Sequence, residues 1–120
     1  MKILFVEDDE NYKKTVADYL RKAGYEVYVT DDVNEAKGLF ECIKPDIIIT
    51  DVVLKTTQSG YALCRWIRER DKDIPVIVAT SRDSKLARFT AKSSGATDFI
   101  TKPYSPEFLL RKIKKIEKNE

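Results

Sequence analysis

Short apolar runs separated by longer amphipathic segments are the feature that most constrains the fold of this chain. Three of the runs are apolar at every position: Ile3–Val6, Ile47–Ile49 and Val76–Ala79. Unbroken apolar runs of this length are typical of strands in a parallel sheet, because helices cover both of its faces. Two less regular runs, Tyr25–Val29 and Phe99–Ile100, are expected to form the edge strands. The sequence therefore predicts five parallel strands.

Each run is followed by a segment in which apolar residues recur at helical spacing, and glycine or proline stands at the junctions. The fourth segment has the weakest stripe, which consists of Leu86, Phe89 and Ala91. Strands that alternate with helices imply right-handed crossovers and helices on both faces of the sheet. We therefore predict one α/β domain over residues 1–120, a doubly wound (βα)5 sandwich with a parallel sheet.

The 120 residues include no histidine. This absence excludes Ser–His and Cys–His nucleophile pairs, imidazole-ligated zinc and histidine proton relays. The two cysteines, Cys42 and Cys64, lie far apart in the sequence, and we expect reduced, partly buried thiols. Any chemistry must come from carboxylates, hydroxyls, amines or the backbone.

The charge distribution and the apolar runs also limit the partners. The net charge is only +2, and the basic residues fall mostly between apolar helix positions, so direct binding to nucleic acid is not expected. No uncharged apolar stretch approaches the ~20 residues of a membrane span, and the first apolar run is too short for a signal peptide. We expect a cytoplasmic protein that does not bind membranes.

Charged and hydroxyl side chains follow four of the predicted strands. Glu7 and Asp8 come after the first strand, Asp51 ends the third, Thr80 follows the fourth, and Lys102 follows the fifth. The carboxyl ends of parallel strands share one edge of the sheet, so these side chains should converge. Clustered carboxylates repel one another unless a cation neutralises them, and such hard oxygen ligands suit Mg²⁺, which commonly also binds phosphate oxygens. The sequence therefore predicts a magnesium and phosphate site.

Residues at these strand ends also have ordinary explanations, and Asp51 alone could be a loop cap. Asp9 and Glu10 have the character of helix N-cap and first-turn residues. Thr80 alone could be a turn hydroxyl, and Lys102 before a proline could be a surface residue. Their joint occurrence at consecutive strand ends favours the functional interpretation.

The motifs at these strand ends resemble the receiver domain of two-component response regulators, and the resemblance covers essentially all 120 residues. Four segments carry it: Ile3–Asp8, Pro45–Asp51, Val76–Ser81 and Gly95–Tyr104. The resemblance implies a phosphoacceptor signalling domain with the CheY-like form of the flavodoxin-like fold, a five-stranded parallel sheet in the order 2-1-3-4-5. It also implies a protein that is not an enzyme, because it catalyses only its own phosphorylation and dephosphorylation.

The resemblance assigns the metal and phosphorylation residues. Asp51 would attack phosphorus and become an acyl phosphate. Asp8 would bind Mg²⁺ directly, Glu7 would act mainly through metal-bound water, and Asp51 with the backbone carbonyl of Val53 would complete the ligands. Mn²⁺ is expected to be able to substitute.

The resemblance also assigns the switch residues. Lys102 would pair with the phosphoryl group, Thr80 would move in to donate a hydrogen bond to it, and Phe99 would turn inward as Thr80 moves. These roles fit phosphoryl transfer, which needs in-line positioning and neutralised oxygens more than an acid or a base. The resemblance also implies a cis Lys102–Pro103 peptide bond, an isomer that the residues themselves do not determine.

The implied phosphate donor is a phosphohistidine on the helical bundle of a sensor histidine kinase. That bundle would meet the first helix and the loop Tyr104–Pro106. A downstream partner, or a second copy of the chain, would use the face formed by the fourth helix, the fifth strand and the fifth helix. Whether the receiver stands alone or precedes an output domain stays open.

The sequence departs from the family pattern in one loop. The family generally has proline where this chain has Lys55, and Asp51–Gly60 is one residue longer than usual.

Three other functions have to be weighed against a phosphoacceptor. A haloacid-dehalogenase-type phosphatase would need a second aspartate at Val53, and an FMN carrier would need a hydroxyl- and glycine-rich loop at Glu7. A degenerate receiver that only binds proteins would not need all the site residues that this chain has.

Overall fold

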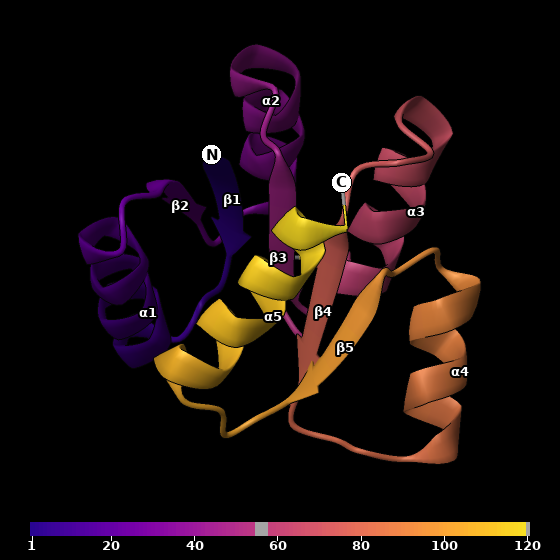
Figure 1. Ribbon diagram of the computed structural model, residues 1–120. Helices are drawn as coiled ribbons and strands as arrows, with labels where there is room; N and C mark the ends of the chain where they lie inside the picture. The colour runs from indigo at the N-terminus through magenta and orange to yellow at the C-terminus, as the bar shows by residue number, and fades with distance from the viewer. Residues whose placement is uncertain (55–57, 120) are drawn as a thin grey trace.

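The computed structural model describes residues 1–54 and 58–119. Ten elements alternate along the chain (Figure 1). They are β1 (Lys2–Val6), α1 (Glu10–Lys22), β2 (Glu26–Thr30), α2 (Val33–Ile43), β3 (Ile47–Asp51), α3 (Gly60–Arg70), β4 (Val76–Thr80), α4 (Lys85–Ser93), β5 (Asp98–Thr101) and α5 (Pro106–Lys118).

The five strands form one parallel sheet in the order β2-β1-β3-β4-β5. Strands β2 and β5 lie at its edges. The predicted doubly wound α/β sandwich, its strand order and its edge strands are therefore confirmed. Lys55, which stands where the family has proline, lies outside the described residues.

Alternation along β1 shows how one sheet supports two cores. Ile3 and Phe5 pack in a cluster with residues of α1 and α5, whereas Leu4 and Val6 pack in a second cluster with residues of α2 and α3. All four side chains are at most 1% exposed. Because successive strand residues point to opposite faces, a strand covered on both faces must be apolar at every position. This requirement explains the unbroken apolar runs.

Every helix begins at a side chain that caps it. Asp9 accepts hydrogen bonds from the backbone N–H groups of Asn11 and Tyr12, at 2.9 and 3.1 Å, so its predicted role as an N-cap is confirmed. Glu10 is the first residue of α1. The other helices are capped in the same way by Asp32, Ser59, Ser84 and Ser105. These caps satisfy backbone donors that have no partner inside the helix.

Two expectations about burial are wrong. In α4, Leu86 and Phe89 are 74% and 68% exposed, and of the three residues of the predicted stripe Ala91 alone is buried. A small residue at the contact lets this helix approach the sheet closely, and the larger residues three apart then face outward. The thiol of Cys64 is buried as expected, but Cys42 is exposed; both cysteines are free.

Gly60, the first residue of α3, lies against the end of β3. Its backbone N–H donates to the carbonyl of Val52 at 2.8 Å. A Cβ atom at this position would lie 2.0 Å from the backbone oxygen of Asp51. Only glycine lets the chain return this closely to the strand that carries Asp51.

Candidate functional site

The strand register brings the carboxyl ends of β1, β3, β4 and β5 to one edge of the sheet. Val6 pairs with Thr50, and Thr80 pairs with Thr101. Asp51 therefore lies beside the residues that follow β1, and Lys102, which follows Thr101, lies beside the end of β4. The convergence expected from the sequence is confirmed.

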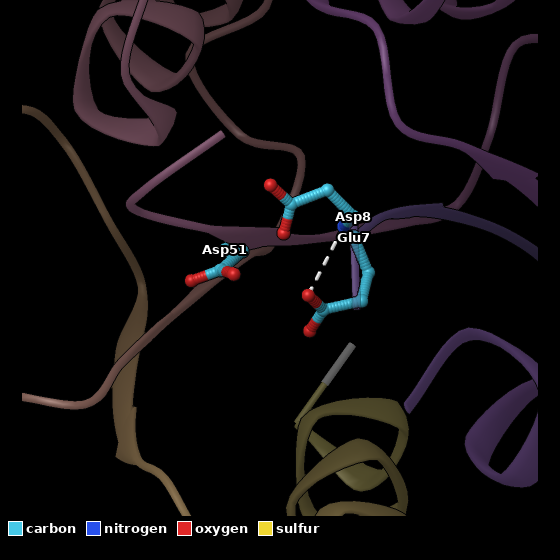
Figure 2. A group of neighbouring side chains, drawn as sticks. All are labelled: Glu7, Asp8 and Asp51. Carbon is cyan, nitrogen blue, oxygen red and sulfur yellow. Dashed lines mark hydrogen bonds between the residues drawn. The ribbon is translucent and has the colours of Figure 1, made fainter. Parts of the chain in front are cut away.

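Three carboxylates meet at this edge. One oxygen from each of Glu7, Asp8 and Asp51 lies within 4.8 Å of the others. Figure 2 shows the Glu7 and Asp8 side chains extending from adjacent positions, with Asp51 opposite them on β3. Glu7 is 1% exposed and Asp51 is 7% exposed, whereas Asp8 is half-buried. Three negative charges so close together, two of them out of water, strongly repel one another.

Local hydrogen bonds fold the chain so that Glu7 points inward. The Glu7 N–H donates to the carbonyl of Thr30 at 3.0 Å. Its Oε2 atom then accepts from the N–H groups of Asp8 and Asp9, each at 3.1 Å. The turn after β1 is therefore closed by the carboxylate of its first residue.

Lys102 is the cation that faces this cluster. Its Nζ atom lies 2.7 Å from Glu7 Oε1 and 3.0 Å from Asp51 Oδ2. It donates a hydrogen bond to Asp51, and the two side chains are 13% and 9% exposed. One ammonium thus contacts two of the three carboxylates.

The pKa shifts of Glu7 and Lys102 reflect the burial of charged groups in this cluster. Burial raises the pKa of Glu7 from 4.5 to about 7; Lys102 opposes this shift, and the charge of Asp51 adds to it. Burial works against the charge of Lys102, but its contacts with Glu7 and Asp51 outweigh that effect and raise its pKa. Lys102 therefore stays charged, while the Glu7 proton is held more tightly than usual.

The cluster has the donor set of a divalent cation site. Its three ligands are all carboxylate oxygens, which hard cations such as Mg²⁺ prefer. Glu7 Oε1 is buried and accepts no hydrogen bond of good geometry from the described residues. Its charge is met by the ion pair with Lys102. Among the residues that the structure describes, one ammonium faces the three carboxylates, and a divalent cation would neutralise the charge that it leaves.

The remaining predicted site residues lie on β4, on β5 and in the loop after β3. Thr80 is buried at the end of β4, and its hydroxyl oxygen accepts from the N–H of Arg82 at 3.2 Å. Val53 lies in the loop after β3, with its side chain 70% exposed. Phe99 is half-buried on β5, and its ring centroid is 5.4 Å from the guanidinium carbon of Arg88. The Lys102–Pro103 bond is cis, as expected.

An aromatic pair beside Lys102 was not anticipated as part of the site. The rings of Tyr12 and Tyr104 are tilted by 42°, with centroids 5.0 Å apart, and Lys102 Nζ lies 4.4 Å from the Tyr12 centroid. The sequence offered one signal, because Tyr12 lies three residues after the N-cap Asp9 and so in the turn of α1 nearest the strand ends. No pattern linked it to a lysine 90 residues away.

A parallel 2-1-3-4-5 sheet with an acidic cluster and a facing lysine at its carboxyl edge defines the class of phosphoacceptor receivers. Residues 3–114 match the family model of the response regulator receiver domain, and the chain belongs to that family.

The chain is also similar to individual proteins and solved structures. The chain is 37% identical over 114 residues to the sensory transduction protein RegX3 of Mycolicibacterium smegmatis, covering 95% of this chain and 49% of that protein. Among solved structures, the Vibrio cholerae chemotaxis protein CheY4 is similar at 30% identity and a TM-score of 0.89, covering 95% of this chain and 96% of CheY4. The BeF3-activated N-terminal receiver domain of Klebsiella pneumoniae RstA is similar at 32% identity and a TM-score of 0.87, with coverage of 95% and 96%.

The chain spans about half the length of the curated relatives it matches. Within the part of the chain that the structure describes, no helix is long and apolar enough to cross a membrane.

Proposed function

We propose that Asp51 is the phosphoacceptor of this receiver. The observation that carries the proposal is the placement of the Asp51 carboxylate, which lies at the end of β3 within 4.8 Å of two further carboxylates and 3.0 Å from Lys102. In the reaction, an Asp51 oxygen attacks the phosphorus of a phosphohistidine. The new O–P bond forms as the N–P bond breaks, and that electron pair returns to the imidazole nitrogen.

Glu7, Asp8 and Asp51 would hold the metal, together with the backbone carbonyl of Val53. Mg²⁺, or Mn²⁺ in its place, would neutralise phosphoryl oxygens that the carboxylates alone would repel. Asp8 would bind the ion directly, and the buried Glu7 would act through metal-bound water. Because a bound cation would neutralise the carboxylates, a phosphate group could then approach the site.

Lys102 and Thr80 would then respond to the phosphoryl group. Lys102 pairs with Asp51 before the reaction and would transfer that contact to a phosphoryl oxygen afterwards. Thr80 would exchange its hydrogen bond with the Arg82 N–H for one that it donates to the phosphoryl group, and Phe99 would turn inward. Phosphorylation would thus shift a population between two conformers.

The protein would act as a signalling domain in the cytoplasm and not as an enzyme with turnover on another substrate. Its donor would be a sensor histidine kinase whose helical bundle meets α1 and the loop Tyr104–Pro106. The face of α4, β5 and α5 would carry the signal to an output partner or a second copy. The domain would comprise residues 1–120 and bind neither membrane nor nucleic acid itself.

The test is Mg²⁺-dependent modification by acetyl phosphate, with beryllofluoride as a stable phosphoryl mimic. Wild-type protein should gain one phosphoryl group, found by mass spectrometry on the peptide that contains Asp51, and EDTA should prevent it. Asp51→Asn should gain none. A wild-type protein that neither reacts nor binds beryllofluoride would instead be a receiver that serves only as a protein-binding scaffold.

A further inference from the structure

We propose that Tyr12 is a positioning residue for Lys102: its ring holds the ammonium at the phosphoryl site when the carboxylates are occupied by a metal ion. This inference rests on the proposed function. Lys102 Nζ lies 4.4 Å from the Tyr12 ring centroid, in addition to its contacts with Glu7 and Asp51. At that distance, the negative face of an aromatic ring attracts a cation.

The three contacts of Lys102 differ in what happens to them during the reaction. Glu7 and Asp51 are both members of the acidic cluster, so a divalent cation would compete with the ammonium for their oxygens. Asp51 is also the group that would be phosphorylated. The Tyr12 ring carries no formal charge and is not a ligand for a hard cation. It is therefore the one of these three contacts that metal binding and phosphorylation leave in place.

Tyr12 is itself fixed from three directions. Its backbone N–H donates to the cap residue Asp9 at 3.1 Å, and its hydroxyl oxygen accepts from the Tyr104 N–H at 3.3 Å. Its ring also packs against the ring of Tyr104, with centroids 5.0 Å apart. Tyr104 lies two residues after Lys102. The same tyrosine thus ties the start of α1 to the segment that carries the lysine, so the lysine stem and the ring are positioned together.

A ring that acts through Lys102 should affect phosphoryl binding and not metal binding. Lys102 is expected to contact the phosphoryl group, whereas the metal ligands are carboxylates. Loss of the ring should therefore weaken beryllofluoride binding at saturating Mg²⁺ by about 5- to 30-fold, the factor that corresponds to a partly desolvated cation–π contact. The affinity for Mg²⁺ alone should not fall.

The variants separate the ring from its hydroxyl and from its bulk. Tyr12→Leu removes the aromatic face, and Tyr12→Met removes it in a second way in case the first variant does not fold. Tyr12→Phe retains the face and loses only the bond from the Tyr104 N–H, so it should stay within about threefold of wild type. Tyr19→Leu is the matched control, because Tyr19 is a half-buried tyrosine farther along α1 that packs on the same core cluster.

Three measurements decide the matter: beryllofluoride titration at saturating Mg²⁺, Mg²⁺ titration alone, and the NMR shift of the Lys102 ε-CH2 group. The ring current of Tyr12 should displace that NMR signal in wild type and Tyr12→Phe but not in Tyr12→Leu or Tyr12→Met. In a Lys102→Met background, Tyr12→Leu should cause no further loss of beryllofluoride affinity, because the contact is already absent.

The outcomes also distinguish this inference from the proposed function. If wild type fails to bind beryllofluoride with Mg²⁺, the proposed function is wrong. If wild type binds and folded Tyr12→Leu and Tyr12→Met bind equally well, only the role of Tyr12 is wrong. An equal loss in Tyr19→Leu, or a further loss in the Lys102→Met background, would show that Tyr12 acts through general packing.

Discussion

Replacement of Asp8 by asparagine should stabilise the metal-free protein and abolish its response to Mg²⁺. An Asp8 oxygen lies within 4.8 Å of oxygens of both Glu7 and Asp51, and the contacts of Lys102 are with those two carboxylates. At this separation each like-charge pair is unfavourable by about 3 kcal/mol for an effective dielectric constant near 20. Because Asp8 is half-buried and screened by solvent and salt, we expect the free energy of unfolding to rise by about 1–2 kcal/mol.

Urea denaturation at pH 8, with EDTA or with Mg²⁺, measures both effects. Burial raises the pKa of Glu7 to about 7, so this carboxyl is mostly ionised at pH 8 and the repulsion is nearly complete. Excess Mg²⁺ should stabilise wild type by about 2.7 kcal/mol at 100 times its dissociation constant. The same concentration should do little for Asp8→Asn, which lacks a metal ligand.

The matched control is Asp73→Asn. Asp73 is an exposed carboxylate in the loop before β4, at the opposite edge of the sheet from the acidic cluster. This variant should change the free energy of unfolding by no more than about 0.5 kcal/mol and keep the full Mg²⁺ response. The reasoning fails if Asp8→Asn is less stable than wild type in EDTA, or if it gains as much stability from Mg²⁺.

Three further predictions concern residues near the site, with one helical glycine as a control. Gly60→Ala should lower the free energy of unfolding by about 1–3 kcal/mol, because its Cβ would lie 2.0 Å from the Asp51 carbonyl oxygen. Gly38→Ala should instead raise it by up to ~1 kcal/mol, because Gly38 lies within α2 and nothing there would contact the new Cβ; urea denaturation checks both variants. Asp9→Ala should lose about 1 kcal/mol by the same assay, since it removes the cap of α1, and an unchanged midpoint would contradict that role. Val53→Asn should hasten loss of phosphate from Asp51, because the exposed Val53 side chain cannot orient an attacking water, and an unchanged decay of the phosphorylated peptide would exclude this explanation.

The fold was predictable because its strongest constraint is local. A strand that is covered on both faces must be apolar at every position, and Ile3–Val6 and Val76–Ala79 satisfy that rule without reference to the rest of the chain. The acidic cluster followed almost as directly, because carboxyl ends of parallel strands share an edge. The stripe of α4 failed for the opposite reason. Periodicity identifies a helix but not which of its faces packs, and there the small Ala91 is buried while Leu86 points to solvent.

The contacts of Lys102 could not be predicted from sequence, because they depend on how the loop after β5 packs against the residue after β1, the end of β3 and the first turn of α1. Spacing in the chain places the lysine at the correct edge of the sheet. It does not show that the Nζ atom reaches Glu7 and Asp51, nor that the ring of Tyr12 lies 4.4 Å away. Those distances arise from packing between segments that lie 51 to 95 residues apart in the chain, for which a single sequence has no periodic signal.

The charge balance of the pocket explains why such a site suits a switch. Among the described residues, three carboxylates face one ammonium, so the metal-free pocket keeps an excess of negative charge, and burial of the two apolar cores must offset its cost in stability. A fully neutralised pocket would be more stable, but it would have no affinity left for a divalent cation. Because Lys102 is shared by Glu7 and Asp51, any group that binds either carboxylate also changes the place of the lysine. Under the proposed function, binding at the acidic cluster would therefore be coupled to the position of Lys102, and the ring of Tyr12 would limit how far that side chain can move.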